Sequence, residues 1–242
     1  AAAQPGAHGN AFDRVGSFLD GMRGGVSACS EYPTSPPLIT QRPFLSPDDA
    51  ARGGDVPFEE LAPLLLPTLE VFWAEQLAAM GGSWDGTTGL GDSATDPMCA
   101  SAELLETRSG SVYCPESTTV VVDVDQVLVP LYSQFGDFGS AFVLALGWAQ
   151  RAQVELGLPV EGPEATLQAT CFTGAWTAAV AEGVTTGTDD TGNPVGGSLS
   201  PGDLDEAIQA ILYLGEHDGG SAFERFEVFR DGFLDGVDGC VA

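Results

Sequence analysis

Residues 113–153 read YCPESTTVVVDVDQVLVPLYSQFGDFGSAFVLALGWAQRAQ, and this stretch decides the fold class. Its valine-rich part, residues 120–124, predicts a β-strand, and the segment 115–117 predicts a turn that leads into it from a preceding strand. The apolar residues that follow recur at helical spacing and predict helices at about 126–134 and 138–156. A small sheet followed by helices predicts an α+β fold, mainly helical, with a small antiparallel sheet.

The flanking segments are expected to add further helices to this body. Ser200, with Pro201 and Asp203 behind it, has the features of a helix start: a hydroxyl cap, a proline in the first turn and a carboxylate at the positive end. The last helix carries phenylalanines three and four residues apart, which indicates core packing. The expected helices span 10–23, 58–80, 163–182, 200–215 and 221–235, and the phenylalanines are Phe223, Phe226, Phe229 and Phe233.

Three segments are expected to lie outside helices. Residues 31–57 are rich in proline, which cannot donate to a hydrogen-bonded ladder, so they predict an extended linker. The Gly- and Asp-rich segment 81–98 predicts a loop with room for a short strand, and 183–198 predicts a loop.

A second stretch, residues 166–176, reads TLQATCFTGAW. Together with 113–153, it resembles the bacterial neutral zinc metallopeptidases, and the resemblance covers about residues 58–242. In that family, a turn and strand precede a helix of the form A-H-E-[WF]-G-H-x-x-Q, and a later helix reads E-L-Q-A-D-C-[FL]-A-G-x-W. The resemblance implies a zincin-like metallopeptidase domain.

The residues that would carry the family's chemistry are absent. Two histidines one helical turn apart would bind zinc, the glutamate between them would activate water, and a glutamate of the later helix would complete the ligand set. The motif is replaced here by Leu146, Gly147 and Gln150, and the later helix carries Thr166 and Thr170. Leu, Gln and Thr are not useful zinc ligands, so the resemblance implies a vestigial site with no metal, no cofactor and no catalytic residues. The chain's two histidines, His8 and His217, lie elsewhere.

One short element occurs twice in the chain. Residues 9–29 and 220–240 align without a gap at an offset of 211, and 10 of the 21 positions are identical, from Gly9 and Gly220 to Cys29 and Cys240. Residues 1–30 are therefore interpreted as the C-terminal tail helix of a preceding repeat, with the linker at 31–57 and the main domain at 58–242. Convergence of two amphipathic helices is the alternative. The tail helix is expected to pack on the main domain, because its apolar face would otherwise be exposed.

The five cysteines suggest two disulfides. Cys99 and Cys114 flank a short loop, and Cys240 needs a partner within its repeat, for which Cys171 is left. The equivalent partner of Cys29 would then lie in the upstream copy. Two bridges predict an extracytoplasmic protein, secreted or associated with the cell envelope. Buried free thiols in a cytosolic protein remain the alternative.

Charge limits the possible partners. Eight basic and 35 acidic side chains give a net charge of −27, which disfavours binding to nucleic acid and to anionic lipid. Cationic partners or divalent ions would suit such a surface. No apolar run is long enough for a transmembrane helix.

These observations favour a pseudo-peptidase that binds or scaffolds other proteins, including the upstream repeat. An extended peptide could add to the edge of strand 118–124 beside the vestigial site. Two alternatives remain open: a structural accessory subunit of a cell-envelope membrane complex, and an active hydrolase that uses other residues. For the hydrolase, Asp123 and Asp125 alternate on the predicted strand and would supply paired carboxylates.

Overall fold

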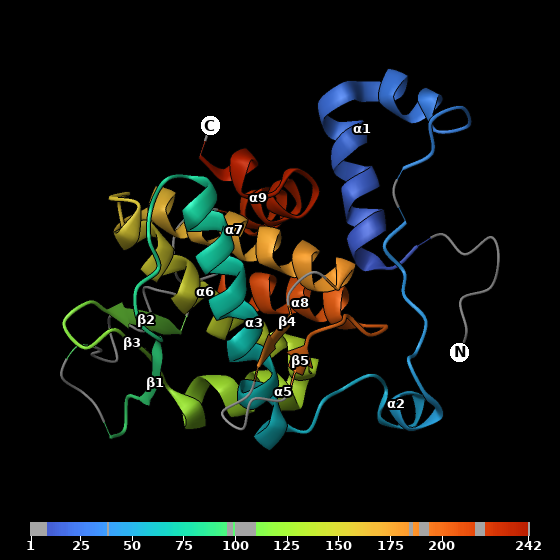
Figure 1. Cartoon of the computed structure of the whole chain (residues 1–242). Helices are drawn as coiled ribbons and strands as arrows, with labels where there is room; N and C mark the ends of the chain where they lie inside the picture. Colours follow the sequence, from blue (N-terminus) through green and yellow to red (C-terminus); the bar gives the residue numbers. More distant parts are fainter. Residues whose placement is uncertain are drawn as a thin grey trace.

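The computed structural model describes residues 9–37, 39–95, 99, 110–183, 186–188, 194–215 and 221–241. Its fold is α+β, with a helical body that carries a small sheet on one side and helix α1 on the other (Figure 1). The helices are α1 (Ala11–Glu31), α2 (Pro47–Arg52), α3 (Phe58–Ala79), α5 (Val129–Phe135), α6 (Asp137–Glu155), α7 (Pro163–Glu182), α8 (Asp203–Leu214) and α9 (Ala222–Asp235). A π-helical turn, η1 (Val124–Leu128), precedes α5, and a 3-10 turn, η2 (Val237–Cys240), follows α9.

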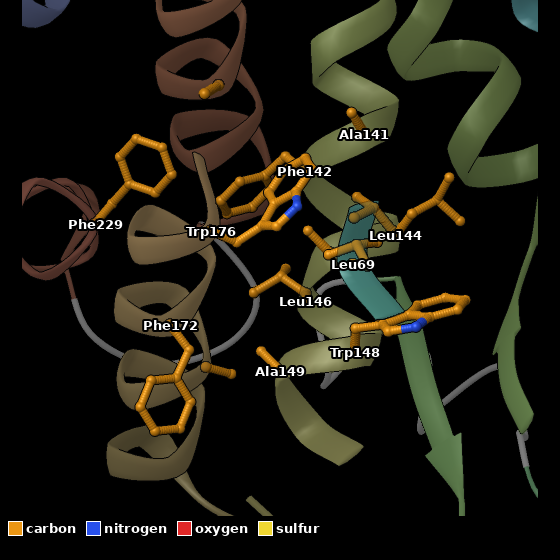
Figure 2. Packing of buried hydrophobic residues seen from close by; sticks show 14 of the residues in the cluster. Leu69, Ala141, Phe142, Leu144, Leu146, Trp148, Ala149, Phe172, Trp176 and Phe229 are labelled. Atoms are coloured by element: carbon orange, nitrogen blue, oxygen red, sulfur yellow. The ribbon is translucent and has the colours of Figure 1, made fainter. Parts of the chain in front are cut away.

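Helix α6 is the centre of the body. Residues 137–153 are all buried, because the helix packs against α3, α7, α8 and the sheet. Most of these side chains are apolar or small, and the long polar ones, Gln150, Arg151 and Gln153, form hydrogen bonds in the interior. Leu146 points from α6 toward α7, whereas Trp148 lies on the opposite side of the helix (Figure 2). The predicted helices of the body are confirmed, with ends that shift by a few residues.

The main sheet is mixed, so the prediction of an antiparallel sheet was only partly right. Its strands are β1 (Gly89–Asp92), β2 (Ser111–Cys114) and β3 (Thr119–Val122), in the order β1-β3-β2. The turn after Cys114 makes β2 and β3 antiparallel, but β1 pairs with β3 in parallel. The long connection from β1 through β2 to β3 allows this parallel pairing.

Two segments predicted to be irregular contain regular structure. The linker contains the short helix α2. The Ser46 side chain caps its start, and Gly53, in a left-handed conformation with φ 83°, ends it. Segment 183–198 contains an antiparallel hairpin of β4 (Thr186–Thr188) and β5 (Pro194–Gly196). Local capping and backbone pairing therefore override the composition of these segments.

Helix α1 packs on the body, as expected for the tail element. The Phe12 ring contacts those of Phe226, Phe229 and Phe233, with centroid separations of 5.1–6.2 Å. An ion pair joins Arg230 of α9 to Asp20 of α1 at 3.1 Å. The assignment of residues 1–30 to a preceding repeat stays a prediction.

Both predicted disulfides form, Cys99 with Cys114 and Cys171 with Cys240, and Cys29 is exposed and unpaired. The second bridge spans a sequence separation of 69 residues, for which loop-closure entropy gives a stabilisation of roughly 4 kcal/mol. Among the described residues, no helix is long and apolar enough to cross a membrane.

Candidate functional site

Three of the vestigial positions meet between α6 and α7. Leu146 and Gln150 lie one turn apart on α6, and they line the same small pocket as Thr166 of α7. The pocket has a volume of only about 10 Å³, which is barely enough for one water molecule. The convergence agrees with what the resemblance implied, but the space is closed.

Gln150 closes this crevice through hydrogen bonds to strand β2. Its Oε1 accepts the Tyr113 N–H at 3.0 Å, and its Nε2 donates to the Ser111 carbonyl at 2.9 Å. The side-chain amide thus occupies the outer edge of β2, where an added strand would bind. Strand β3 lies between β1 and β2, so neither of its edges is free. The expected addition of a peptide beside residues 118–124 was therefore wrong.

The general-base position is blocked as well. Gly147 faces the sheet so closely that a Cβ there would overlap Cγ1 of Val120. Thr170 is buried and its hydroxyl donates to the Thr166 carbonyl at 2.8 Å, so it does not reach the pocket. Position 147 therefore leaves no room for an acidic side chain without repacking.

A larger cavity lies near the first turn of α6. It has a volume of about 280 Å³ and is bounded by α3, α6, α7, the segment 197–203 and the linker. Most of its wall is apolar, and three carboxylates, Asp49, Asp137 and Asp203, line it together with the guanidinium of Arg52. The apolar wall comprises Leu45, Val56, Leu61, Leu64, Leu65, Phe138, Ala141, Trp176, Val180 and Leu199. Sequence patterns did not predict this cavity, because its residues come from separate segments.

Four carboxylates gather at this end of α6. Asp137 Oδ2 accepts the Val56 N–H at 2.7 Å, and Glu206 Oε2 accepts the Phe138 N–H at 2.9 Å. Asp203 accepts hydrogen bonds from the backbone N–H and the hydroxyl of Ser200. Asp55 completes the group from the linker. Within the described residues, none of the four forms an ion pair with an arginine.

Burial changes how these carboxylates titrate. Burial, with a smaller contribution from the charge of Asp137, raises the pKa of Asp203 to about 8. Burial, followed by the charges of Asp137 and Asp203, raises the pKa of Glu206 to about 9. Burial raises the pKa of Asp137 to about 6, against the opposing effect of the Val56 hydrogen bond. At neutral pH, Asp203 and Glu206 therefore hold protons and Asp137 is ionised.

The cluster also offers oxygen ligands for a hard cation. Ligand oxygens of Asp55, Asp137 and Glu206 lie within 4.8 Å of one another. No N–H or hydroxyl group of the described residues donates to the buried Asp137 Oδ1, and the protonated carboxyl of Glu206 is the neighbour that hydrogen-bonds Asp137. Carboxylates in this arrangement can share protons or hold a divalent cation such as Ca²⁺.

The carboxylate pair suggested for a hydrolase is not on a strand. Strand β3 ends at Val122, and the Asp123 side chain caps η1 by accepting the Gln126 N–H at 2.8 Å. Asp125 lies in that helical turn and is exposed. Capping accounts for Asp123 where alternation along a strand had been expected.

We compared the chain with models of protein families, with curated proteins and with solved structures, and found no match. The metallopeptidase resemblance therefore rests on the motif residues of the sequence alone.

Proposed function

We propose that this chain is a catalytically inactive, metallopeptidase-like domain with a zincin-like ancestry that acts in extracytoplasmic protein binding or scaffolding. The main support is the crevice between α6 and α7. There Leu146, Gln150 and Thr166 line one small pocket, while packing and hydrogen bonds fill the space. The two disulfides support an oxidising compartment.

The cavity at the first turn of α6 is the binding site in this proposal. Its volume of about 280 Å³ is near the lower end of ligand pockets, which suits one apolar side chain of a partner. The carboxylates in its wall and the net charge of −27 favour a basic partner segment around that side chain. The partner is thus expected to be a peptide or protein loop with an apolar residue between basic ones.

Digestion of casein in the presence of added Zn²⁺ tests the inactive state. We expect no cleavage above a buffer control. Cleavage that is lost in an Asp137→Asn variant would overturn the proposal and favour a hydrolase that uses the acidic cluster.

Binding to a library of short peptides tests the choice of site. We expect peptides with Leu or Phe between Lys and Arg residues to bind, and Ala141→Leu, which fills the cavity, to weaken that binding at least tenfold. Ala78→Leu on the exposed face of α3 is the matched control. Equal binding by both variants would contradict the assignment. Capture of a stable membrane partner from a detergent extract would instead favour the accessory-subunit function.

A further inference from the structure

The two copies of the repeated element have the same local structure. Each helix starts with a capping box, formed by Asn10 and Asp13 in α1 and by Ser221 and Glu224 in α9. Each is interrupted at an equivalent glycine, Gly25 with φ 63° and ψ −159°, and Gly236 with φ 70° and ψ −162°. Residues 211 positions apart therefore occupy equivalent places in the two elements.

In α9, one face of the element covers α7 at very short range. Phe229, Phe233 and Val237 on this face are buried. A Cβ on Gly232 would overlap the Cys171 carbonyl, and a Cβ on Gly174 would overlap the Phe229 carbonyl. The two backbones thus meet at paired glycines, and the Cys171–Cys240 disulfide fastens the contact.

In α1, the described residues leave most of the equivalent face open, although the Phe18 ring contacts that of Phe223 in α9 at a centroid separation of 6.2 Å. The counterparts of the three buried residues are Phe18, Met22 and Val26, which are 55%, 65% and 86% exposed. Gly21, the counterpart of Gly232, has only the Cys29 Sγ near the position of a Cβ, at 3.1 Å. Cys29, the counterpart of Cys240, is exposed and unpaired.

A different face of α1 is buried against the body. Phe12, Gly16 and Leu19 are buried there. The tail helix thus packs on the main domain as predicted, but Phe18 and Met22 of its apolar face stay exposed. Full burial of a large apolar side chain stabilises a protein by about 1.5–3 kcal/mol, so the uncovered face leaves a substantial driving force for association.

We propose that this face of α1, formed by Phe18, Gly21, Met22, Val26 and Cys29, docks a helix of the α7 type from another domain. That helix would carry the Cys-x-x-Gly spacing of Cys171 and Gly174 and would lack a closing helix of its own. A second copy of this chain does not qualify, because its own α9 covers its α7. The inference follows from the repeat and does not depend on the proposed function.

The docked cysteine would form a disulfide with Cys29. The two thiols lose two protons and two electrons to a disulfide oxidant, which is reduced to two thiols. Cys29 would then have the role in this contact that Cys240 has in the main domain.

A peptide with the sequence of residues 163–182 tests the proposal on the full chain. With oxidised glutathione present, we expect mass spectrometry to show a Cys29–peptide disulfide that forms at least tenfold faster than with a Gly174→Leu peptide. Met22→Glu in the chain should remove this preference without affecting the fold, because Met22 is exposed. Equal rates for the two peptides, or no adduct at Cys29, would overturn the proposal.

A chimera gives a second test in which no peptide has to fold. Residues 221–240 are replaced by the sequence of residues 10–29, which keeps the register and the cysteine. We expect the chimera to fold and to form the disulfide with Cys171, and a further Gly→Leu change at position 232 to prevent both. A folded chimera with an unpaired Cys171 would contradict the equivalence of the two faces.

Discussion

Two parts of helix α6 differ in how fully their polar groups are satisfied. In the middle, the Gln150 amide hydrogen-bonds the backbone of β2, and Gly147 packs directly on β3. At the first turn, no N–H or hydroxyl group of the described residues donates to Asp137 Oδ1, Asp137 shares a hydrogen bond with the Glu206 carboxyl, and a cavity of about 280 Å³ opens beside it. Polar groups without partners next to open space can still gain from a ligand, whereas satisfied ones cannot. Any remaining binding capacity is therefore expected at the first turn.

Among the substitutions that test this difference, Gly147→Glu should change the free energy of unfolding most. The side chain would overlap Val120 and bury a charge against the sheet, so we expect a loss of at least about 4 kcal/mol in the free energy of unfolding. Urea denaturation measures the loss, and Ala78→Glu on an exposed position of α3 is the control. A Gly147→Glu protein as stable as the control would show that there is room for an acidic side chain between α6 and the sheet.

The buried carboxylates at the first turn of α6 should make the stability of the fold depend on pH. The pKa values of Asp137, Asp203 and Glu206 are raised in the folded state, so their contribution is present below about pH 4 and is lost as pH rises through about 6 to 9. In a chelating buffer, we expect the free energy of unfolding to fall by at least about 4 kcal/mol between pH 5 and pH 9, the amount that the raised pKa of Asp203 alone would give. Urea denaturation across this range checks it, and Asp203→Asn should flatten the profile. A profile that rises with pH would contradict the account.

Gln150→Leu tests the middle part of α6, where the polar groups have hydrogen-bond partners. The substitution leaves the Tyr113 N–H and the Ser111 carbonyl buried without partners, which should cost about 2 kcal/mol. Chemical denaturation of this variant and of Gln126→Leu, at an exposed position, gives the comparison. A loss no larger than that of the control would mean that these hydrogen bonds do not close the crevice.

Replacing two alanines of α6 and α7 by leucine should give the smallest difference in stability. Ala169 borders the crevice of about 10 Å³, and Ala141 borders the cavity of about 280 Å³. Leucine should therefore overpack at position 169 and fit at position 141. We expect Ala169→Leu to cost about 1 kcal/mol more than Ala141→Leu in thermal unfolding. The reverse order would contradict the assignment of closed and open sites.

The sequence predicted the parts of the fold that local patterns encode. The helical spacing of α6 and α7 and the pairing of four cysteines are confirmed, and the motif placed Leu146, Gln150 and Thr166 together. Strand β1 has the sequence Gly-Leu-Gly-Asp, which contains no β-branched residue, so its extended conformation depends on pairing with β3. The acidic cluster joins Asp55, Asp137 and Glu206 from three distant segments, and each of these residues alone resembles an ordinary surface acid.

Restoring the metal ligands tests the central claim most directly. We would introduce Leu146→His and Gln150→His, with Thr166→Glu added or withheld, and leave Gly147 unchanged. Zinc titration of the folded variants should show one equivalent bound to the triple variant, about tenfold or more tighter than to the double variant. Replacing Thr166→Glu by Gln168→Glu, which points elsewhere on α7, should give no such gain. If the triple variant binds zinc no more tightly than the double variant, these positions do not form an inherited metal site.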